Sequence, residues 1–228
     1  MTIARHLDAL ATPRAVLFDL DGTLADTAPD LGHAANLVRA ELGLPALPLA
    51  DYRPVASAGA RGLLGKALGI TPEQADYPAR AQRFLALYRE HLVHHTMLFA
   101  GIDELLGVIA VRGLAWGIVT NKPAWLTDPL VAGLKLRAAC VVSADQVARP
   151  KPAPDALLRA CDLLCLPPQA CWYVGDDRRD IVAAQAAGMP SIAADWGYLG
   201  GDEPITAWGA WHIARTPQEL AAWLRAAP

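Results

Sequence analysis

Two aspartates one residue apart, Asp19 and Asp21, directly follow the apolar residues 15–18 (AVLF), and Gly22 and Thr23 come next. Residues two apart on a strand point to the same side, so we expect the two carboxylates to lie close together. Like charges this close repel each other. The pattern is tolerable only if a cation lies between them, if one is protonated, or if they lie at a solvated end of the strand.

Polar residues also end or follow other apolar runs. If these runs are parallel strands, their carboxyl ends meet at one edge of the sheet, where open α/β sheets bind ligands. Oxygen-rich clusters there suit a hard cation such as Mg²⁺, which keeps part of its water shell and bridges a substrate phosphate. The residues that follow the later runs are Thr120, Asn121 and Lys122, then Lys151, and finally Asp176, Asp177 and Asp180.

The elements that position these residues are apolar strands alternating with amphipathic helices. Continuous apolarity is typical of strands covered on both faces, and βα alternation predicts a parallel sheet with right-handed crossovers. We therefore predict an α/β fold with a Rossmann-like parallel sheet flanked by helices. The expected strands are residues 15–20, 114–119, 139–143, 171–175, 191–195 and, more weakly, 212–215.

Residues 27–96 interrupt the alternation. This stretch contains helical patterns at 30–42, 59–69 and 78–93 and no convincing strand. A structureless segment this long is uncommon inside a domain, so we predict an inserted small helical cap domain above the first strand. The catalytic core would then consist of residues 1–26 and 97–228.

The chain resembles the haloacid dehalogenase superfamily in four motifs that occur in order. They are DLDGT at 19–23, Thr120, the Lys151-Pro152 pair and GDDRRD at 175–180. WGIVTNKP at 116–123 and WGYLGG at 196–201 are similar to bacterial phosphoglycolate phosphatases, particularly their N-acetylmuramic acid 6-phosphate phosphatase relatives. The resemblance covers nearly the whole chain and implies a phosphatase with a Rossmann-like core, a helical cap, Mg²⁺ and an aspartate nucleophile.

The resemblance implies a division of roles between the first two aspartates. Asp19 would attack the phosphorus and form an aspartyl-phosphate. Asp21, kept protonated by crowding and partial burial, would donate a proton to the leaving oxygen and then accept one from water. Mg²⁺ would be held by Asp19, the backbone carbonyl of Asp21, and Asp176.

The remaining motif residues would bind phosphate or orient the others. The Thr120 hydroxyl and the amide of Asn121 would hold phosphate oxygens, and Lys151 would offset charge on the phosphate and on Asp19. Asp177 and Asp180 would orient these groups without touching the metal. Each residue also has an ordinary interpretation as a turn, a helix cap or a solvated lysine, but their joint occurrence favours the catalytic one.

The substrate depends mainly on the cap, where Arg53 and Arg61 flank a glycine-rich segment. Either arginine could contact a carboxylate, which phosphoglycolate shares with the lactyl ether of a muramic acid phosphate. A solvated helix face is an equally good interpretation of these arginines. We expect N-acetylmuramic acid 6-phosphate as substrate, with phosphoglycolate as the alternative.

Three other activities are less consistent with the motifs. A haloacid dehalogenase usually lacks the second aspartate of the first motif. A phosphomutase of this type tends to have Glu-Asp where this chain has Gly175-Asp176. A non-enzymatic receiver module of a signalling protein is also phosphorylated on an aspartate, but its single compact domain leaves no room for an insertion such as residues 27–96.

Composition limits the partners. The 228 residues have a net charge of −3 and no cluster of lysine or arginine, so we predict no nucleic-acid or membrane partner. The N-terminus lacks the apolar stretch of a signal peptide, and we expect a cytoplasmic protein that acts on a small phosphorylated metabolite. The sequence does not indicate an oligomeric state.

Overall fold

Six strands form the central sheet in the computed structural model, which describes residues 12–201 and 203–226. Every neighbouring pair is parallel, in the order β5-β4-β1-β6-β7-β8. The predicted Rossmann-like parallel sheet is therefore confirmed. The strands are β1 Ala15–Phe18, β4 Ala115–Val119, β5 Cys140–Val142, β6 Cys171–Gly175, β7 Ser191–Ala194 and β8 His212–Ala214.

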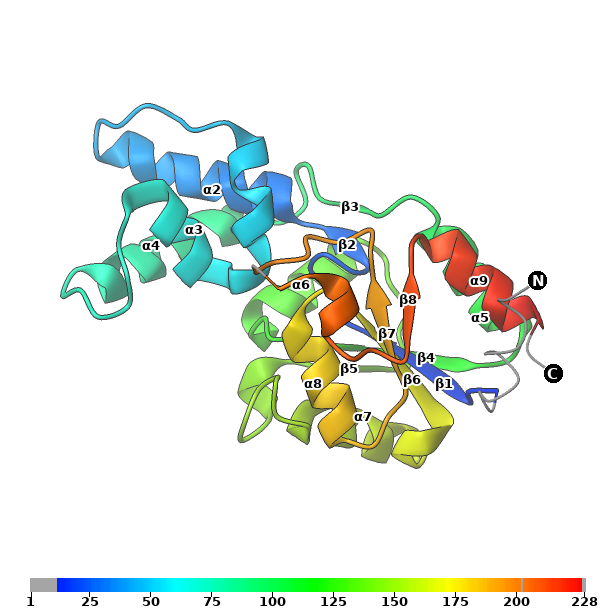
Figure 1. The fold of residues 1–228 in the computed structure, drawn as a ribbon. Helices are drawn as coiled ribbons and strands as arrows, with labels where there is room; N and C mark the ends of the chain where they lie inside the picture. The colour runs from blue at the N-terminus through cyan, green and yellow to red at the C-terminus, as the bar shows by residue number, and fades with distance from the viewer. Residues whose placement is uncertain (1–11, 202, 227–228) are drawn as a thin grey trace.

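Helices cover both faces of this sheet (Figure 1). Val16 and Phe18 of β1 belong to the same buried cluster as residues of α5 (Ile102–Val111), α6 (Ala124–Gly133) and α9 (Pro217–Ala226). Ala15 and Leu17 lie in a second cluster with residues of α7 (Asp155–Leu164) and α8 (Arg178–Ala186). Because both faces are buried, the strand is apolar at every position instead of alternating.

The segment after β1 is helical, as predicted, and residues 27–96, all described, contain no strand. Figure 1 shows its helices together beyond one end of the sheet. The division into a core and a cap domain at residues 27 and 96 stays a prediction, and its residues 1–11 lie outside the described residues. The helices of the segment are α2 Ala28–Glu41, α3 Gly59–Leu68 and α4 Tyr77–Glu90. Short 3-10 turns cover Leu49–Asp51, Arg53–Ala58, Ala144–Gln146, Pro168–Ala170 and Ile205–Ala207.

The sequence pattern missed the connection between the sheet and the helical segment. β2 (Ala25–Asp26) pairs antiparallel with β3 (Met97–Leu98), so the chain leaves and re-enters the sheet along one short ribbon. Strands of two residues are too short to give a periodic signal. In addition, β1 ends at Phe18 rather than at residue 20, because the chain turns at Gly22 with a φ of +86°.

Candidate active site

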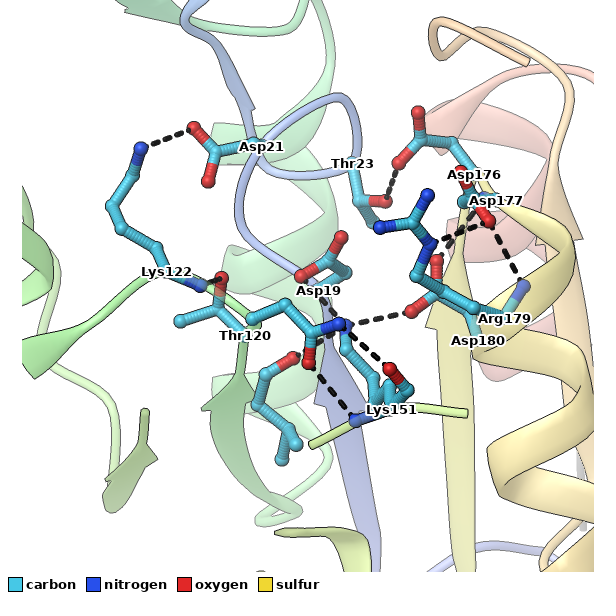
Figure 2. A network of polar contacts seen from close by, with 12 residues as sticks. Asp19, Asp21, Thr23, Thr120, Lys122, Lys151, Asp176, Asp177, Arg179 and Asp180 are labelled. Atoms are coloured by element: carbon cyan, nitrogen blue, oxygen red, sulfur yellow. Dashed lines mark hydrogen bonds and ion pairs between the residues drawn. The ribbon is translucent and has the colours of Figure 1, made fainter. Parts of the chain in front are cut away.

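The polar residues that follow β1, β4 and β6 meet at the carboxyl edge of the sheet (Figure 2). Asp19 follows β1, Thr120 follows β4 and Asp176 follows β6. The order β4-β1-β6 makes these strands neighbours, although they lie far apart in the sequence. The structure thus brings together the strand-end residues that the sequence indicated.

Lys151 is the buried cation of this edge, with 3% of its surface exposed. Its Nζ lies 2.8 Å from Asp19 Oδ1 and 2.7 Å from Asp180 Oδ1. It also donates to the Tyr173 hydroxyl at 2.8 Å and to the Val119 carbonyl at 3.0 Å. Burial acts against the lysine's charge, but Asp180 and Asp19 raise its pKa overall. Lys151 therefore stays charged next to Asp19.

Asn121 fixes the loop that carries this lysine. Its side-chain Nδ2 donates to the Lys151 carbonyl at 2.8 Å, and its Oδ1 accepts from the Lys151 amide at 3.0 Å. These contacts use one of the two Nδ2 N–H groups, so a phosphate contact from Asn121 would come from the other one or from its main-chain N–H. Thr120, which is 1% exposed, accepts a hydrogen bond from the Lys122 amide at 3.1 Å.

Asp176 is fully buried beside Asp19. Its Oδ1 accepts from the Thr23 hydroxyl at 2.8 Å, and its Oδ2 accepts from the Tyr198 amide at 2.9 Å. A Cβ on Gly22 would lie 2.2 Å from Asp176 Oδ2, and one on Gly197 would lie 2.2 Å from Asp176 Cβ. The two glycines thus make the room that this carboxylate occupies.

The acidic residues at this edge fit a hard divalent cation. Asp19, Asp176 and Asp180 each have an oxygen within 4.8 Å of the others. Burial, followed by the charges of Asp19 and Asp180, raises the pKa of Asp176 well above its usual range. Asp19 Oδ1 accepts no well-aligned hydrogen bond despite the nearby Lys151. A cation would relieve both the mutual repulsion and the unsatisfied oxygen.

Within this acidic group, Asp180 differs from the other two. Its Oδ1 is held by Lys151 and by the Tyr173 hydroxyl, and its Oδ2 accepts from the Asp177 amide at 3.1 Å. Asp177 in turn caps α8 by accepting from the Arg179 amide at 2.9 Å. Asp180 is the one of the three that has both an ion pair with Lys151 and hydrogen bonds on both oxygens. The metal-ligand roles of Asp19 and Asp176 and the orienting roles of Asp177 and Asp180 stay predictions.

The two aspartates of the first motif do not crowd each other, so that expectation was wrong. Because β1 ends at Phe18, Asp21 lies on the following turn and points away from Asp19 (Figure 2). Its Oδ1 lies 3.0 Å from Lys122 Nζ and accepts from the Thr27 hydroxyl at 2.6 Å. Asp19 and Asp21 are therefore paired with two different lysines.

Lys122 links the core to the helical segment. Its buried Nζ lies 3.3 Å from the Tyr88 hydroxyl of α4 and 4.6 Å from the centre of that ring. Sequence reasoning noted Lys122 after the second strand but gave it no role. The pairing with Tyr88 could not have been found from the sequence, because 34 residues separate the two.

The two cap arginines lie outside the lining of the cavity. Arg53 forms an ion pair with Asp26 at 2.8 Å and lies over the Tyr198 ring, 5.1 Å from its centre. Arg61 is exposed on α3. Neither of them lines the cavity above Asp19. A role of Arg53 or Arg61 as a substrate contact stays a prediction.

A cavity of about 390 Å³ lies above Asp19, between the sheet edge and the helical segment. Asp19, Asp21, Thr120, Asn121, Lys122, Lys151, Asp177 and Arg179 contribute its polar groups. Leu31, Phe84, Leu85 and Leu126 contribute apolar surface, and Tyr88 completes that side. Such a volume is typical of small-molecule sites. Arg179 was not singled out from the sequence, since nothing in GDDRRD distinguishes it from Arg178.

Comparisons with known proteins agree with this arrangement. The model of the haloacid dehalogenase-like hydrolase family matches residues 16–194. The chain is 44% identical over 217 residues to a phosphoglycolate phosphatase from Xanthomonas campestris pv. campestris, covering 92% of this chain and 97% of the relative. It is 39% identical over 209 residues to an N-acetylmuramic acid 6-phosphate phosphatase from Pseudomonas aeruginosa, covering 91% and 92%.

Solved structures show the same fold. A predicted phosphoglycolate phosphatase from Haemophilus somnus matches with a TM-score of 0.81 at 23% identity, over 94% of this chain and 99% of that one. A phosphoglycolate phosphatase-like protein from Lactobacillus delbrueckii subsp. bulgaricus matches with a TM-score of 0.78 at 26% identity, over 93% and 98%. None of the helices in residues 12–201 and 203–226 is long and apolar enough to cross a membrane.

Proposed function

The chain belongs to the haloacid dehalogenase-like hydrolase family and is a phosphatase, and from this premise we propose that it hydrolyses N-acetylmuramic acid 6-phosphate through an aspartyl-phosphate on Asp19. Phosphoglycolate is the alternative substrate. The observation that carries the mechanism is the position of Asp19, which lines the cavity while paired with buried Lys151 at 2.8 Å. A carboxylate held in this way is oriented for attack and its charge is partly offset.

The proposed reaction has two displacements at phosphorus. The first step requires that Asp21 carries a proton when the substrate binds. An Asp19 oxygen then forms a bond to phosphorus, the ester P–O bond breaks, and the leaving oxygen takes this proton from Asp21. Water, giving its proton to Asp21, then attacks the same phosphorus and releases phosphate from Asp19. Lys122, at 3.0 Å, fixes the direction of the Asp21 carboxylate during these proton transfers.

Charge neutralisation is the main requirement, because a phosphomonoester dianion must approach a carboxylate. Lys151 supplies one positive charge at this point, and Thr120 and the Asn121 main chain are the proposed donors to phosphate oxygens. Asp19, Asp176 and the Asp21 carbonyl would hold Mg²⁺. When bound, this ion would offset the phosphoryl charge and align the group for in-line attack.

The choice of the sugar rests on the size and character of the cavity. Its volume is about 390 Å³, and a two-carbon acid phosphate would fill only a small part of it. The apolar side of the cavity, where Leu85 is partly exposed and Leu31 and Phe84 are buried, suits the methyl groups of an N-acetyl and a lactyl substituent. The relatives are named for both substrates, and the cavity supports the larger one.

The test is phosphate release with and without Mg²⁺ from N-acetylmuramic acid 6-phosphate, phosphoglycolate, hexose 6-phosphates and β-glucose 1-phosphate. We expect Asp19→Asn to lower kcat by at least about 10³-fold, because the nucleophile is lost while the shape is kept. Asp162→Asn, an exposed aspartate of α7, is the matched control. Equal rates for wild type and Asp19→Asn would contradict the mechanism.

The same panel decides the substrate. We expect kcat/KM for N-acetylmuramic acid 6-phosphate to exceed that for phosphoglycolate by about 10²-fold, which corresponds to roughly 2.7 kcal/mol of transition-state binding. A reversed preference would identify phosphoglycolate as the substrate instead of N-acetylmuramic acid 6-phosphate, and the proposed role of Asp19 would be unaffected.

A further inference from the structure

Three cationic side chains line the cavity: Lys122, Lys151 and Arg179. Lys151 is shared between Asp19 and Asp180, at 2.8 and 2.7 Å. The buried Lys122 is held by Asp21 and Tyr88. Both lysines are therefore committed to carboxylates that take part in the proposed reaction or orient its groups.

Arg179 is held differently, at the place where α8 meets the helical segment. Its Nε donates to Asp177 Oδ1 at 2.9 Å, and its Nη1 donates to the Ser57 carbonyl at 3.2 Å. Figure 2 shows the guanidinium next to Asp177. The side chain is 29% exposed, so part of it faces open space while the rest is fixed. Arg179 thus spans the boundary between the two walls of the cavity.

The contacts of Arg179 leave several N–H donors of its guanidinium available. A guanidinium has five N–H donors in a rigid plane, and the two contacts above use one on Nε and one on Nη1. Within the part of the chain that the structure describes, no hydrogen bond engages Nη2. One N–H on Nη1 and two on Nη2 therefore remain, and a carboxylate can accept from two such donors of a guanidinium.

A substrate that carries a carboxylate needs a partner for this second charge. A carboxylate without a cation would lie in a cavity that already contains Asp19, Asp21 and Asp177. Arg53 is paired with Asp26 and Arg61 is exposed, and neither lines the cavity. Among the lining residues, Arg179 has the donors that such a group requires.

We infer that Arg179 binds the carboxylate of the substrate and so selects phosphomonoesters that carry a second anionic group. This inference rests on the proposed function and deepens it. Its contact to Ser57 places the carboxylate at the boundary of the two walls, where a bound substrate would touch both. Arg179 is thus a specificity-determining residue, separate from the groups that react at phosphorus.

The test compares two substrates, N-acetylmuramic acid 6-phosphate and N-acetylglucosamine 6-phosphate, which differ only in the lactyl ether group that carries the carboxylate. For Arg179→Ala we expect kcat/KM for the muramic acid ester to fall by about 50-fold, mostly through KM, as for the loss of a charge-assisted hydrogen-bonded pair. The fall for the glucosamine ester should be at most about fivefold, so the preference for the muramic acid ester shrinks by at least about tenfold. Arg179→Lys should restore part of it, since lysine keeps the charge but not the fork.

Arg178→Ala is the matched control. Arg178 is the preceding residue on α8, is 60% exposed and pairs with Glu203 at 2.7 Å, away from the cavity. This variant should keep the preference of the wild type. Thermal unfolding of each variant identifies any that is misfolded, and Arg179→Lys serves as the second test if Arg179→Ala does not fold.

Two results would overturn the inference. Equal losses for both substrates in Arg179→Ala would mean that Arg179 only joins the walls of the cavity. Equal kcat/KM values of the wild type for the two substrates would mean that the carboxylate has no role in selection. Phosphate release that depends on Asp19 would still support the phosphatase mechanism in that case. If the wild type instead prefers phosphoglycolate, the pair phosphoglycolate and ethyl phosphate gives the same comparison, and the proposed sugar fails without the inference.

Discussion

Lys122 shows how a single side chain joins the two parts of the cavity. It lies between Asp21 at 3.0 Å and the Tyr88 hydroxyl at 3.3 Å, and both neighbours raise its pKa although burial acts against its charge. For Tyr88, burial raises the pKa to about 12, so the phenol stays neutral beside the lysine. The direction of Asp21 therefore depends on a lysine that also contacts α4.

At this scale we expect Lys122→Met to lower kcat by about 10- to 100-fold, because the proposed acid and base loses the ion pair that orients it. Methionine keeps most of the volume, so packing changes little. Steady-state kinetics on the preferred substrate measures the effect. Lys66→Met removes an exposed lysine paired with Asp51 at 3.2 Å and should behave as wild type. Unchanged kcat in Lys122→Met would show that Asp21 does not depend on Lys122.

At the scale of the element, the turn after β1 decides where the motif residues point. Gly22 has a φ of +86°, in the left-handed region that glycine adopts without strain. The turn separates Asp21 from Asp19 and brings Gly22 against Asp176, the carboxylate that follows β6. The glycine of the motif is thus required both by the backbone and by the space for Asp176.

Two glycine variants separate these two requirements. Gly43→Ala, at a φ of +69° with no atom within 4 Å of the added Cβ, should cost about 1–2 kcal/mol of unfolding free energy from backbone strain alone. Gly22→Ala should cost at least as much and also weaken Mg²⁺ binding by about tenfold or more, since its Cβ would lie 2.2 Å from Asp176 Oδ2. Urea unfolding and Mg²⁺ titration measure the two effects. Equal Mg²⁺ affinity in both variants would be evidence against Asp176 as a ligand.

At the scale of the whole molecule, the sheet edge gathers carboxylates that oppose folding when no cation is bound. Burial, only partly offset by Lys151, raises the pKa of Asp19 from 3.8 to about 7. Between about pH 4 and pH 7 the metal-free folded chain therefore keeps a proton that the unfolded chain has lost. The stability that this group contributes is complete below pH 3.8 and is lost as the pH rises through about 7.

Asp19→Asn tests this pH dependence, because asparagine does not titrate. In EDTA, the unfolding free energy of Asp19→Asn minus that of wild type should increase steadily as the pH rises from about 4 to 7. Urea unfolding at several pH values gives this difference. A difference that stays constant across the window would mean that the Asp19 pKa is not raised.

Mg²⁺ should reverse the destabilisation. At a concentration 100 times its Kd, Mg²⁺ should add about 2.7 kcal/mol and raise Tm by roughly 5–10 °C, because it binds the folded chain. In Asp176→Asn the metal-free protein should be more stable than wild type at neutral pH, since burial raises the pKa of Asp176 and folding no longer has to protonate a carboxylate, and the gain from Mg²⁺ should disappear. Asp128→Asn, an exposed residue of α6, should retain the full gain. An undiminished gain in Asp176→Asn would place the metal elsewhere.

The sequence by itself determined the local features of this protein. The strands of the central sheet are mostly apolar runs, and the helices show amphipathic patterns, so the sheet and the helical segment followed from patterns along the chain. The residues Asp19, Thr120, Lys151 and Asp176 were recognisable by their type and order. Only the tertiary structure decided which partners the neighbouring side chains Asp21 and Arg179 contact. Asp21 turns to Lys122, and Arg179 reaches the carbonyl of Ser57, 122 residues away. Such contacts depend on the turn at Gly22 and on the packing of helices against the sheet, and no local pattern records them.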